Sequence, residues 1–95
     1  MLGQPEQNNV VAWLILGYLC SHPDAKDTVV GVEKWWLQPE GVEVSTRQVQ
    51  STLDGLVEWG WLTSMTSPST VTVYGLNKAC LSLLRRLLQG QSSTH

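Results

Sequence analysis

Cys20-Ser21-His22-Pro23-Asp24 is the densest run of reactive side chains in the sequence. It offers a thiol, a hydroxyl, an imidazole and a carboxylate, which are groups used in nucleophilic catalysis and metal binding. Four unrelated side chains on one turn point in different directions, however. Zinc sites also need three or four converging ligands, and the chain has only two histidines, one of them at its C-terminal end. Pro23 and Asp24 are therefore better explained as a helix stop followed by a cap.

Other signatures of catalysis are missing from the sequence. It has no Gly-rich phosphate loop, no nucleophile elbow and no site of paired carboxylates. Cys20 and Cys80 lie far apart with no CxxC spacing, so we expect both to be reduced core residues. We predict that the protein is not an enzyme and that it binds no metal and no cofactor.

Length and composition favour one small globular domain. Ninety-five residues allow one modest core, and 42% of them are hydrophobic. Only 15% are charged, against roughly 25% in an average domain. The formal net charge of -2 excludes a generic polycation that coats DNA or acidic membranes.

The N-terminal region carries no evident targeting signal. Met1–Asn9 lacks the positive charge of a secretory signal, because the first basic residue is Lys26. The longest apolar run, Val10–Cys20, is shorter than the about 20 residues that a membrane span needs. We expect a cytoplasmic protein with no membrane contact, in which this run is a buried helix.

Apolar periodicity and capping residues predict four helices. They cover Val10–Cys20, Ala25–Leu37, Ser45–Trp59 and Lys78–Leu88. Asn8 or Asn9 caps the first helix, which is apolar around nearly its whole circumference. Asp24 or Asp27 caps the second, and the third begins with the capping box Ser45-Thr46-Arg47-Gln48.

Two strands are expected between the third and fourth helices. Leu62–Met65 and Thr70–Leu76 are rich in β-branched residues and flank Thr66-Ser67-Pro68-Ser69, a pattern typical of a β-hairpin. Gly60 ends the helix before the hairpin, and Gly90 ends the last helix.

The five tryptophans are expected to divide between core and surface. Trp35 and Trp36 cannot both point inward, because neighbours on a helix lie about 100° apart. We predict that Trp36 is in the core and that Trp35 is partly exposed, as a lid on the core or a partner anchor. Trp13, Trp59 and Trp61 are expected to be core and hairpin-packing residues.

This order of elements resembles the winged helix-turn-helix superfamily, of the general MarR and PadR regulator type. Ser45–Leu62 (STRQVQSTLDGLVEWGWL) looks like the recognition helix with its Gly-Trp-Leu exit into the wing. Val71–Leu76 (VTVYGL) looks like the returning wing strand. The resemblance implies a single α+β winged helix-turn-helix domain over residues 10–89, with three helices, a two-stranded wing and a C-terminal helix. Residues 1–9 and 90–95 are then a flexible lead-in and tail.

The resemblance also implies that the third helix reads the major groove of double-stranded DNA while the wing contacts the backbone. On the helix, the implied contacts are Thr46, Arg47, Gln50 and Ser51. The implied backbone and wing contacts are Lys34, Ser67, Ser69 and Thr70, with Ser64 and Thr66 as further hydroxyls. Arginine can contact guanine and glutamine adenine, and hydroxyls suit phosphate or either base. The expected function is that of a small transcriptional regulator.

The distribution of charge argues for an alternative. Residues 1–60 carry three basic and eight acidic side chains, whereas residues 61–95 carry three basic and no acidic ones. Asp54 and Glu58 share the solvent face of the third helix with Arg47. A strong duplex binder neutralises roughly 6–10 phosphates, and one copy of this chain offers about two or three. The alternative is a winged helix that binds another protein and not DNA, with Trp35 as an anchor.

The leucine face of the fourth helix is wider than a core stripe needs. Leu83 and Leu87 either form a homodimer seam along residues 78–88 or pack against the first helix. A dimer would double the DNA contacts and add Arg85 and Arg86.

Overall fold

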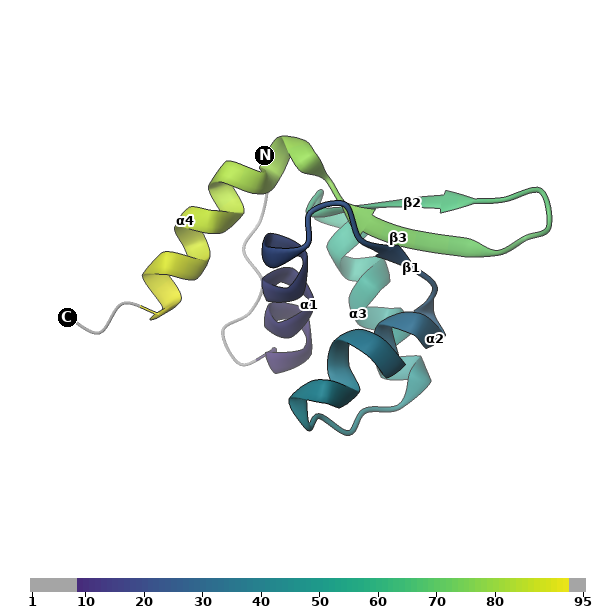
Figure 1. Cartoon of the computed structure of the whole chain (residues 1–95). Helices are drawn as coiled ribbons and strands as arrows, with labels where there is room; N and C mark the ends of the chain where they lie inside the picture. The colour runs from purple at the N-terminus through teal and green to yellow at the C-terminus, as the bar shows by residue number, and fades with distance from the viewer. Residues whose placement is uncertain (1–8, 93–95) are drawn as a thin grey trace.

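The computed structural model describes residues 9–92 of the chain. Within this range the fold is α+β, with four α-helices and a three-stranded antiparallel sheet (Figure 1). The helices are α1 (Val10–Ser21), α2 (Val29–Gly31), α3 (Thr46–Glu58) and α4 (Leu81–Ser92). The strands β1 (Lys26–Asp27), β2 (Leu62–Thr66) and β3 (Thr72–Leu76) lie in the order β1-β3-β2. Helices α1, α2 and α3 gather on one side of the sheet, and α4 runs away from it (Figure 1).

Helix α1 is the central helix, as its composition predicts. The side chain of Asn9 accepts a hydrogen bond from the N–H of Ala12 at 3.1 Å, which confirms this residue as the N-cap. Ile15, Leu16 and Leu19 are completely buried. The helix continues one residue beyond Cys20, and Pro23 follows its end.

The second helix begins later than the sequence predicts. Lys26 and Asp27 form β1 and pair with Gly75 and Tyr74 of β3. The cap is neither Asp24 nor Asp27 but Thr28, whose hydroxyl accepts from the N–H of Gly31 at 3.2 Å. The prediction was wrong here because a two-residue strand is stabilised only by pairing with β3, far away in sequence.

After α2 the chain continues as a π-helix, η1 (Val32–Leu37), and then as a 3-10 helix, η2 (Gln38–Glu40). The backbone leaves this turn at Gly41, whose φ of 76° lies in the left-handed region. Residues 42–44, which lead into α3, have no regular secondary structure.

Helix α3 has the predicted start and end. The hydroxyl of Ser45 accepts from the N–H of Gln48 at 3.0 Å, so the N-cap half of the capping box is confirmed. At the other end Gly60 has φ of 91°. This conformation lets the N–H of Trp61 donate to the carbonyl of Leu56 at 3.0 Å, which closes the helix and turns the chain into β2.

The predicted hairpin is confirmed, with β2 and β3 paired from Leu62↔Leu76 at the base to Thr66↔Thr72 near the turn. The strands differ from the predicted bounds by one or two residues. The expected two-stranded sheet was too small, because β1 adds a third strand beside β3.

The tryptophans divide as predicted except for one. Trp36 and Trp61 are 3% and 1% exposed, and Trp35 is 67% exposed. Trp13 is half-buried. Trp59 was expected to be a core or hairpin-packing residue, and its side chain is 51% exposed. It is the C-cap of α3, beyond the stripe of α3 that packs on the core.

The C-terminal helix begins and ends later than expected. Lys78–Cys80 form a 3-10 turn, η3, whose cap is Asn77. Helix α4 then runs through Gly90 to Ser92, so the predicted end at Leu88 was wrong. The remainder of the predicted flexible lead-in and tail, residues 1–8 and 93–95, lies outside the described residues. Within residues 9–92, no helix is long and apolar enough to cross a membrane.

Thr70 holds a strained backbone conformation at the tip of the hairpin. Its φ is 65°, which is unfavourable for a β-branched residue. The turn requires this conformation, because the N–H of Thr70 donates to the carbonyl of Ser67, and the N–H of Ser67 donates to the carbonyl of Val71, both at 2.9 Å.

We expect Thr70→Asn to raise the free energy of unfolding by about 0.5–1 kcal/mol, because asparagine tolerates the left-handed region better than threonine does. Urea unfolding followed by circular dichroism measures the change. Ser69→Asn is the control, since Ser69 does not have a positive φ. An equal gain in both variants would contradict the explanation from strain.

Candidate nucleic-acid interface

Arg47 and Ser51 are two of the predicted contacts on α3, and both are exposed. They lie four residues apart and therefore on one face of the helix. Within residues 9–92, neither side chain forms a hydrogen bond or an ion pair with another side chain. The structure thus leaves an arginine and a hydroxyl available to an external partner on this face of α3.

Gln50, the third predicted contact on α3, is held by the sheet. Its side-chain amide donates to the Tyr74 hydroxyl at 2.7 Å and to the Asp54 carboxylate at 2.9 Å. The hydroxyl of Tyr74 in turn donates to Asp54 at 3.1 Å. Burial raises the pKa of Tyr74, which keeps the phenol protonated and able to donate. Both N–H groups of the Gln50 amide are thus engaged, so a bidentate contact with adenine requires that at least one of these bonds be broken.

Thr46, the fourth predicted contact, also has an internal role. Its hydroxyl donates to the Glu33 carboxylate at 2.8 Å, which ties the first turn of α3 to η1. Arg47 follows Thr46 in the sequence, and Lys34 follows Glu33. Both of these cationic side chains are exposed. The bond therefore brings the two cationic side chains to the same end of the molecule.

The predicted hydroxyls of the hairpin tip are engaged with one another. The hydroxyls of Ser67 and Ser69 are 2.9 Å apart, and the hydroxyl of Thr70 donates to the carbonyl of Ser69 at 2.5 Å. These bonds shape the turn, which projects beyond the helices (Figure 1). Residues 62–76 contain no charged side chain, so the hairpin can offer hydroxyl groups but no cation to a phosphate.

Acidic groups lie close to the exposed face of α3. Asp54 and Glu58 are exposed and follow Ser51 at helical spacing, so they continue the line that begins with Arg47. Carboxylates repel phosphate in these positions. Only the N-terminal half of α3 therefore presents a surface suited to a polyanion.

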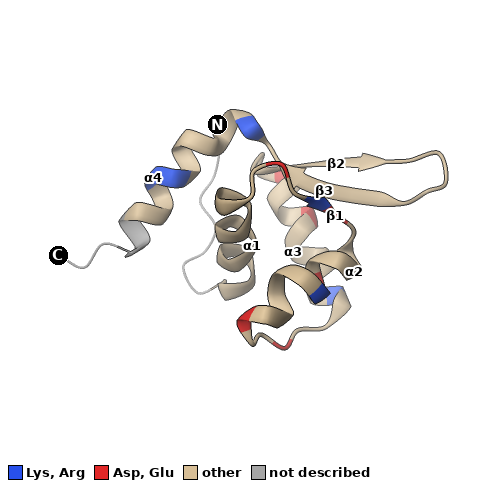
Figure 2. Cartoon of the chain, viewed as in Figure 1, with Lys and Arg blue, Asp and Glu red and all other residues tan. Residues whose placement is uncertain are grey.

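The remaining cations lie elsewhere. Figure 2 shows Lys and Arg on α4 and, well separated from them, at the opposite end of the molecule near α2. Arg85 and Arg86 of α4 are exposed. Lys78 forms an ion pair with Asp24, and this ammonium group lowers the pKa of the Asp24 carboxyl. Lys26, on β1, also lowers the pKa of the Asp24 carboxyl by its charge. The cations of one copy are thus spread over α4, β1 and the region near α2 and do not form one basic patch (Figure 2).

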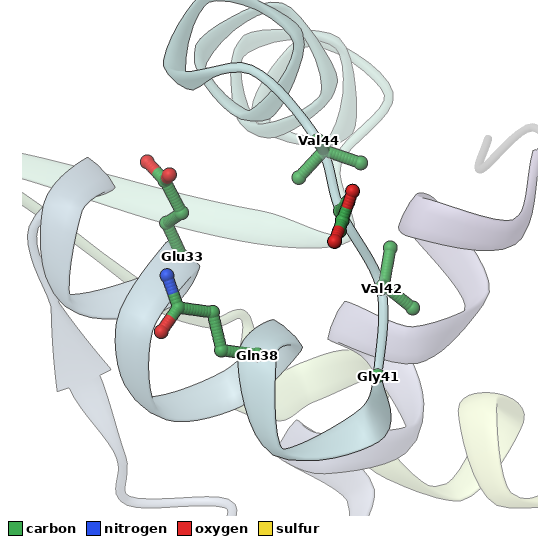
Figure 3. A pocket seen from close by; sticks show the side chains of 6 residues that line it. Glu33, Gln38, Gly41, Val42 and Val44 are labelled. Carbon is green, nitrogen blue, oxygen red and sulfur yellow. The ribbon is translucent and has the colours of Figure 1, made fainter.

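An open pocket of about 370 Å³ lies beside the first turn of α3, between the η1–η2 turns and the segment that leads into α3 (Figure 3). Its lining residues are Glu33, Gln38, Gly41, Val42, Glu43 and Val44. Figure 3 shows the side chains of Glu33 and Gln38 on one side and those of Val42 and Val44 on the other. The carboxylates of Glu33 and Glu43 would repel phosphate in this pocket. The candidate interface therefore does not extend into it. None of its lining residues was predicted from the sequence to be part of a site.

The predicted partner residues do not form one surface. Trp35 is exposed on η1, whereas Leu83 is 42% exposed on α4. Leu87 packs against the core and is half-buried. Among the described residues, five further large apolar side chains are exposed: Val10, Val30, Trp59, Met65 and Val71. Met65 on β2 is the most exposed of them.

No group of three or more histidine, cysteine or acidic side chains able to hold a metal occurs in residues 9–92. Comparison of the chain with known protein families, with curated proteins and with solved structures finds no match. The molecule itself offers one distinctive polar feature, an exposed Arg47–Ser51 pair on a helix that is capped at its start and followed by a projecting hairpin.

Proposed function

We propose that this protein is a small winged-helix DNA-binding protein, a transcriptional regulator that reads the major groove with α3. The observation that supports the proposal is the position of Arg47. It is exposed near the N-terminus of α3 with Ser51 one turn further on. N-terminal residues of a recognition helix are those that contact base edges, and a bidentate arginine–guanine contact is the commonest specific one.

Other side chains are assigned to the DNA backbone or to the support of α3. Lys34 contacts a phosphate beside α3, and the hydroxyls of Ser67, Ser69 and Thr70 contact the backbone from the tip of the hairpin. Thr46 bonds α3 to η1, and Gln50 bonds α3 to β3, so neither side chain is needed as a base contact.

Two copies of the chain would supply more phosphate contacts than one. The exposed side chain of Leu83 supports a homodimer seam along α4, which also carries the exposed Arg85 and Arg86. Leu87 contributes little to such a seam, because it already packs against the core of its own chain.

The test is the binding of a labelled mixed-sequence duplex, measured by fluorescence anisotropy at about 20 and about 200 mM salt. We expect micromolar binding at low salt. Affinity should fall about 100-fold at high salt, because log K changes by about -0.9 per neutralised phosphate for each tenfold rise in salt. Absence of binding at about 20 mM salt would refute the proposal.

Glu58→Lys should strengthen duplex binding about tenfold at low salt and steepen the salt dependence by about one phosphate. Glu58 is exposed on the same face of α3 as Arg47, so the substitution exchanges a repulsion for an attraction at the proposed interface. Glu40→Lys is the matched control, because it makes the same change in net charge at an exposed position on η2. Equal effects of the two variants would show that net charge, and not α3, governs binding.

A second function, that of a protein-interaction module, is favoured by Trp35. A tryptophan that is 67% exposed is a common anchor at protein interfaces. If no duplex binds, Trp35→Ala should abolish association with the partner while the fold stays intact.

A further inference from the structure

Strand β2 has an unpaired edge. Within residues 9–92 the sheet order β1-β3-β2 leaves β2 paired with β3 alone. The N–H of Ser67 donates to the carbonyl of Val71, and the N–H of Asn77 donates to the carbonyl of Trp61, both at 2.9 Å. Hydrogen-bonded pairs alternate with non-hydrogen-bonded pairs in an antiparallel ladder. These two bonds therefore show that the odd-numbered residues between 61 and 67 direct their backbone N–H and C=O groups toward β3. Leu62, Ser64 and Thr66 therefore direct their N–H and C=O groups outward.

In the part of the chain that the structure describes, this edge has none of the usual protection against strand pairing. Natural edge strands are commonly guarded by lysine, proline or a covering element. Residues 62–76 contain no charge, and the one proline among them, Pro68, is in the turn. The hairpin also projects past the helices (Figure 1). A second strand can therefore approach β2 without meeting a charge or a helix along the outer part of the hairpin.

We propose that β2 pairs with β2 of a second copy of this chain, antiparallel and around a two-fold axis perpendicular to the sheet. The register that uses every outward-facing residue sets Ser64 opposite the partner's Ser64, and Leu62 opposite the partner's Thr66. The two sheets then form one sheet of six strands. Because such an axis preserves the faces of the sheet, both α3 helices lie on the same side of it.

The second copy is the occupant that the chemistry of this edge fits best. In this register Ser64 faces the partner's Ser64 at the two-fold axis, and because β2 carries no charge, none of its residues meets a like charge across the pair. The same register places Thr63 beside the partner's Met65 and so covers an apolar side chain that is 68% exposed in one copy. It also carries the partner's turn past Gly60, next to the exposed Trp59.

Two five-residue strands make a small contact. Such a contact falls below the about 1,200 Å² of a stable interface, so we expect a weak dimer that depends on concentration. This pairing does not depend on DNA binding. It uses the edge of the projecting hairpin, whereas the proposed leucine seam is on α4, which runs away from the sheet (Figure 1).

Sedimentation equilibrium of the full chain between about 5 and 500 µM tests the proposal. The background variant Leu83→Lys removes any seam on α4. In this background, Ser64→Lys and Ser64→Glu each place two like charges face to face at the two-fold axis. We expect each variant alone to weaken association at least tenfold, and an equimolar mixture of the two to restore it.

Ser64 is exposed and its backbone groups face away from β3, so circular dichroism should show an unchanged fold in both variants. Ser21→Lys, at an exposed position at the end of α1, is the control and should leave association as it is. The proposal is overturned if the background protein is monomeric throughout, if either Ser64 variant self-associates as well as the control, or if the mixture is no tighter than its components. If the protein is a monomer, the β2 edge is free to pair with an extended segment of another protein and not with a second copy.

Discussion

Trp36→Ala is expected to lower the free energy of unfolding by about 3–5 kcal/mol, the range found when a buried tryptophan is truncated. Trp36 is 3% exposed and belongs to the hydrophobic core. Its ring stacks on that of Tyr18 with centroids 4.6 Å apart and an interplanar angle of 13°. The substitution removes both the buried area and the stacking, which alone contributes about 0.5–1.5 kcal/mol.

The neighbouring residue is a matched control for this prediction. Trp35→Ala removes the same atoms from a side chain that is 67% exposed, so we expect a change below about 1 kcal/mol. Urea unfolding followed by far-UV circular dichroism compares the two, since tryptophan fluorescence changes with each substitution. Similar losses in both variants would contradict the structure at η1.

The exposure of the tryptophans shows which features local sequence can predict. Trp35 and Trp36 could be assigned to surface and core, because helical periodicity decides which of two neighbours faces inward. Periodicity gave no such guide for Trp59, which is the C-cap residue where the chain leaves α3. Signals that act within a few residues, such as the cap Ser45 and the helix end at Gly60, were equally predictable.

Features that depend on distant residues were not predictable. Strand β1 is two residues long and exists because Lys26 and Asp27 pair with β3, almost 50 residues further along the chain. The end of α4 was placed at Gly90 on local propensity, although a glycine within a helix costs only about 1 kcal/mol.

The internal hydrogen bonds of the candidate interface also depend on residues that are distant in the sequence. The sequence placed four polar residues near the start of α3, and the structure divides them into two groups. Arg47 and Ser51 face solvent, whereas Gln50 bonds to Tyr74, 24 residues away. Thr46 bonds to Glu33 on η1. No helical pattern carries information about these long-range bonds.

Because Gln50 is held internally, the proposed base reading depends on Arg47. We expect Arg47→Ala to weaken binding to the preferred duplex by about 5- to 150-fold, equivalent to the 1–3 kcal/mol of a bidentate arginine–guanine contact. The loss should appear as a relaxed preference at a single guanine. A selection from random duplexes with each protein, followed by anisotropy on the selected sites, measures both effects.

Arg85→Ala separates this reading role from simple loss of charge. It removes the same charge from an exposed position on α4, so it should weaken all sequences equally and leave the selected site unchanged. Gln50→Ala should likewise leave the base preference unchanged, because the amide serves Tyr74 and Asp54 and not a base. If the site selected by Arg47→Ala matches that of the unmodified protein, Arg47 is a phosphate contact. If instead Gln50→Ala changes the selected base, then DNA binding must break the Gln50–Tyr74 bond, and the recognition surface forms only on the duplex.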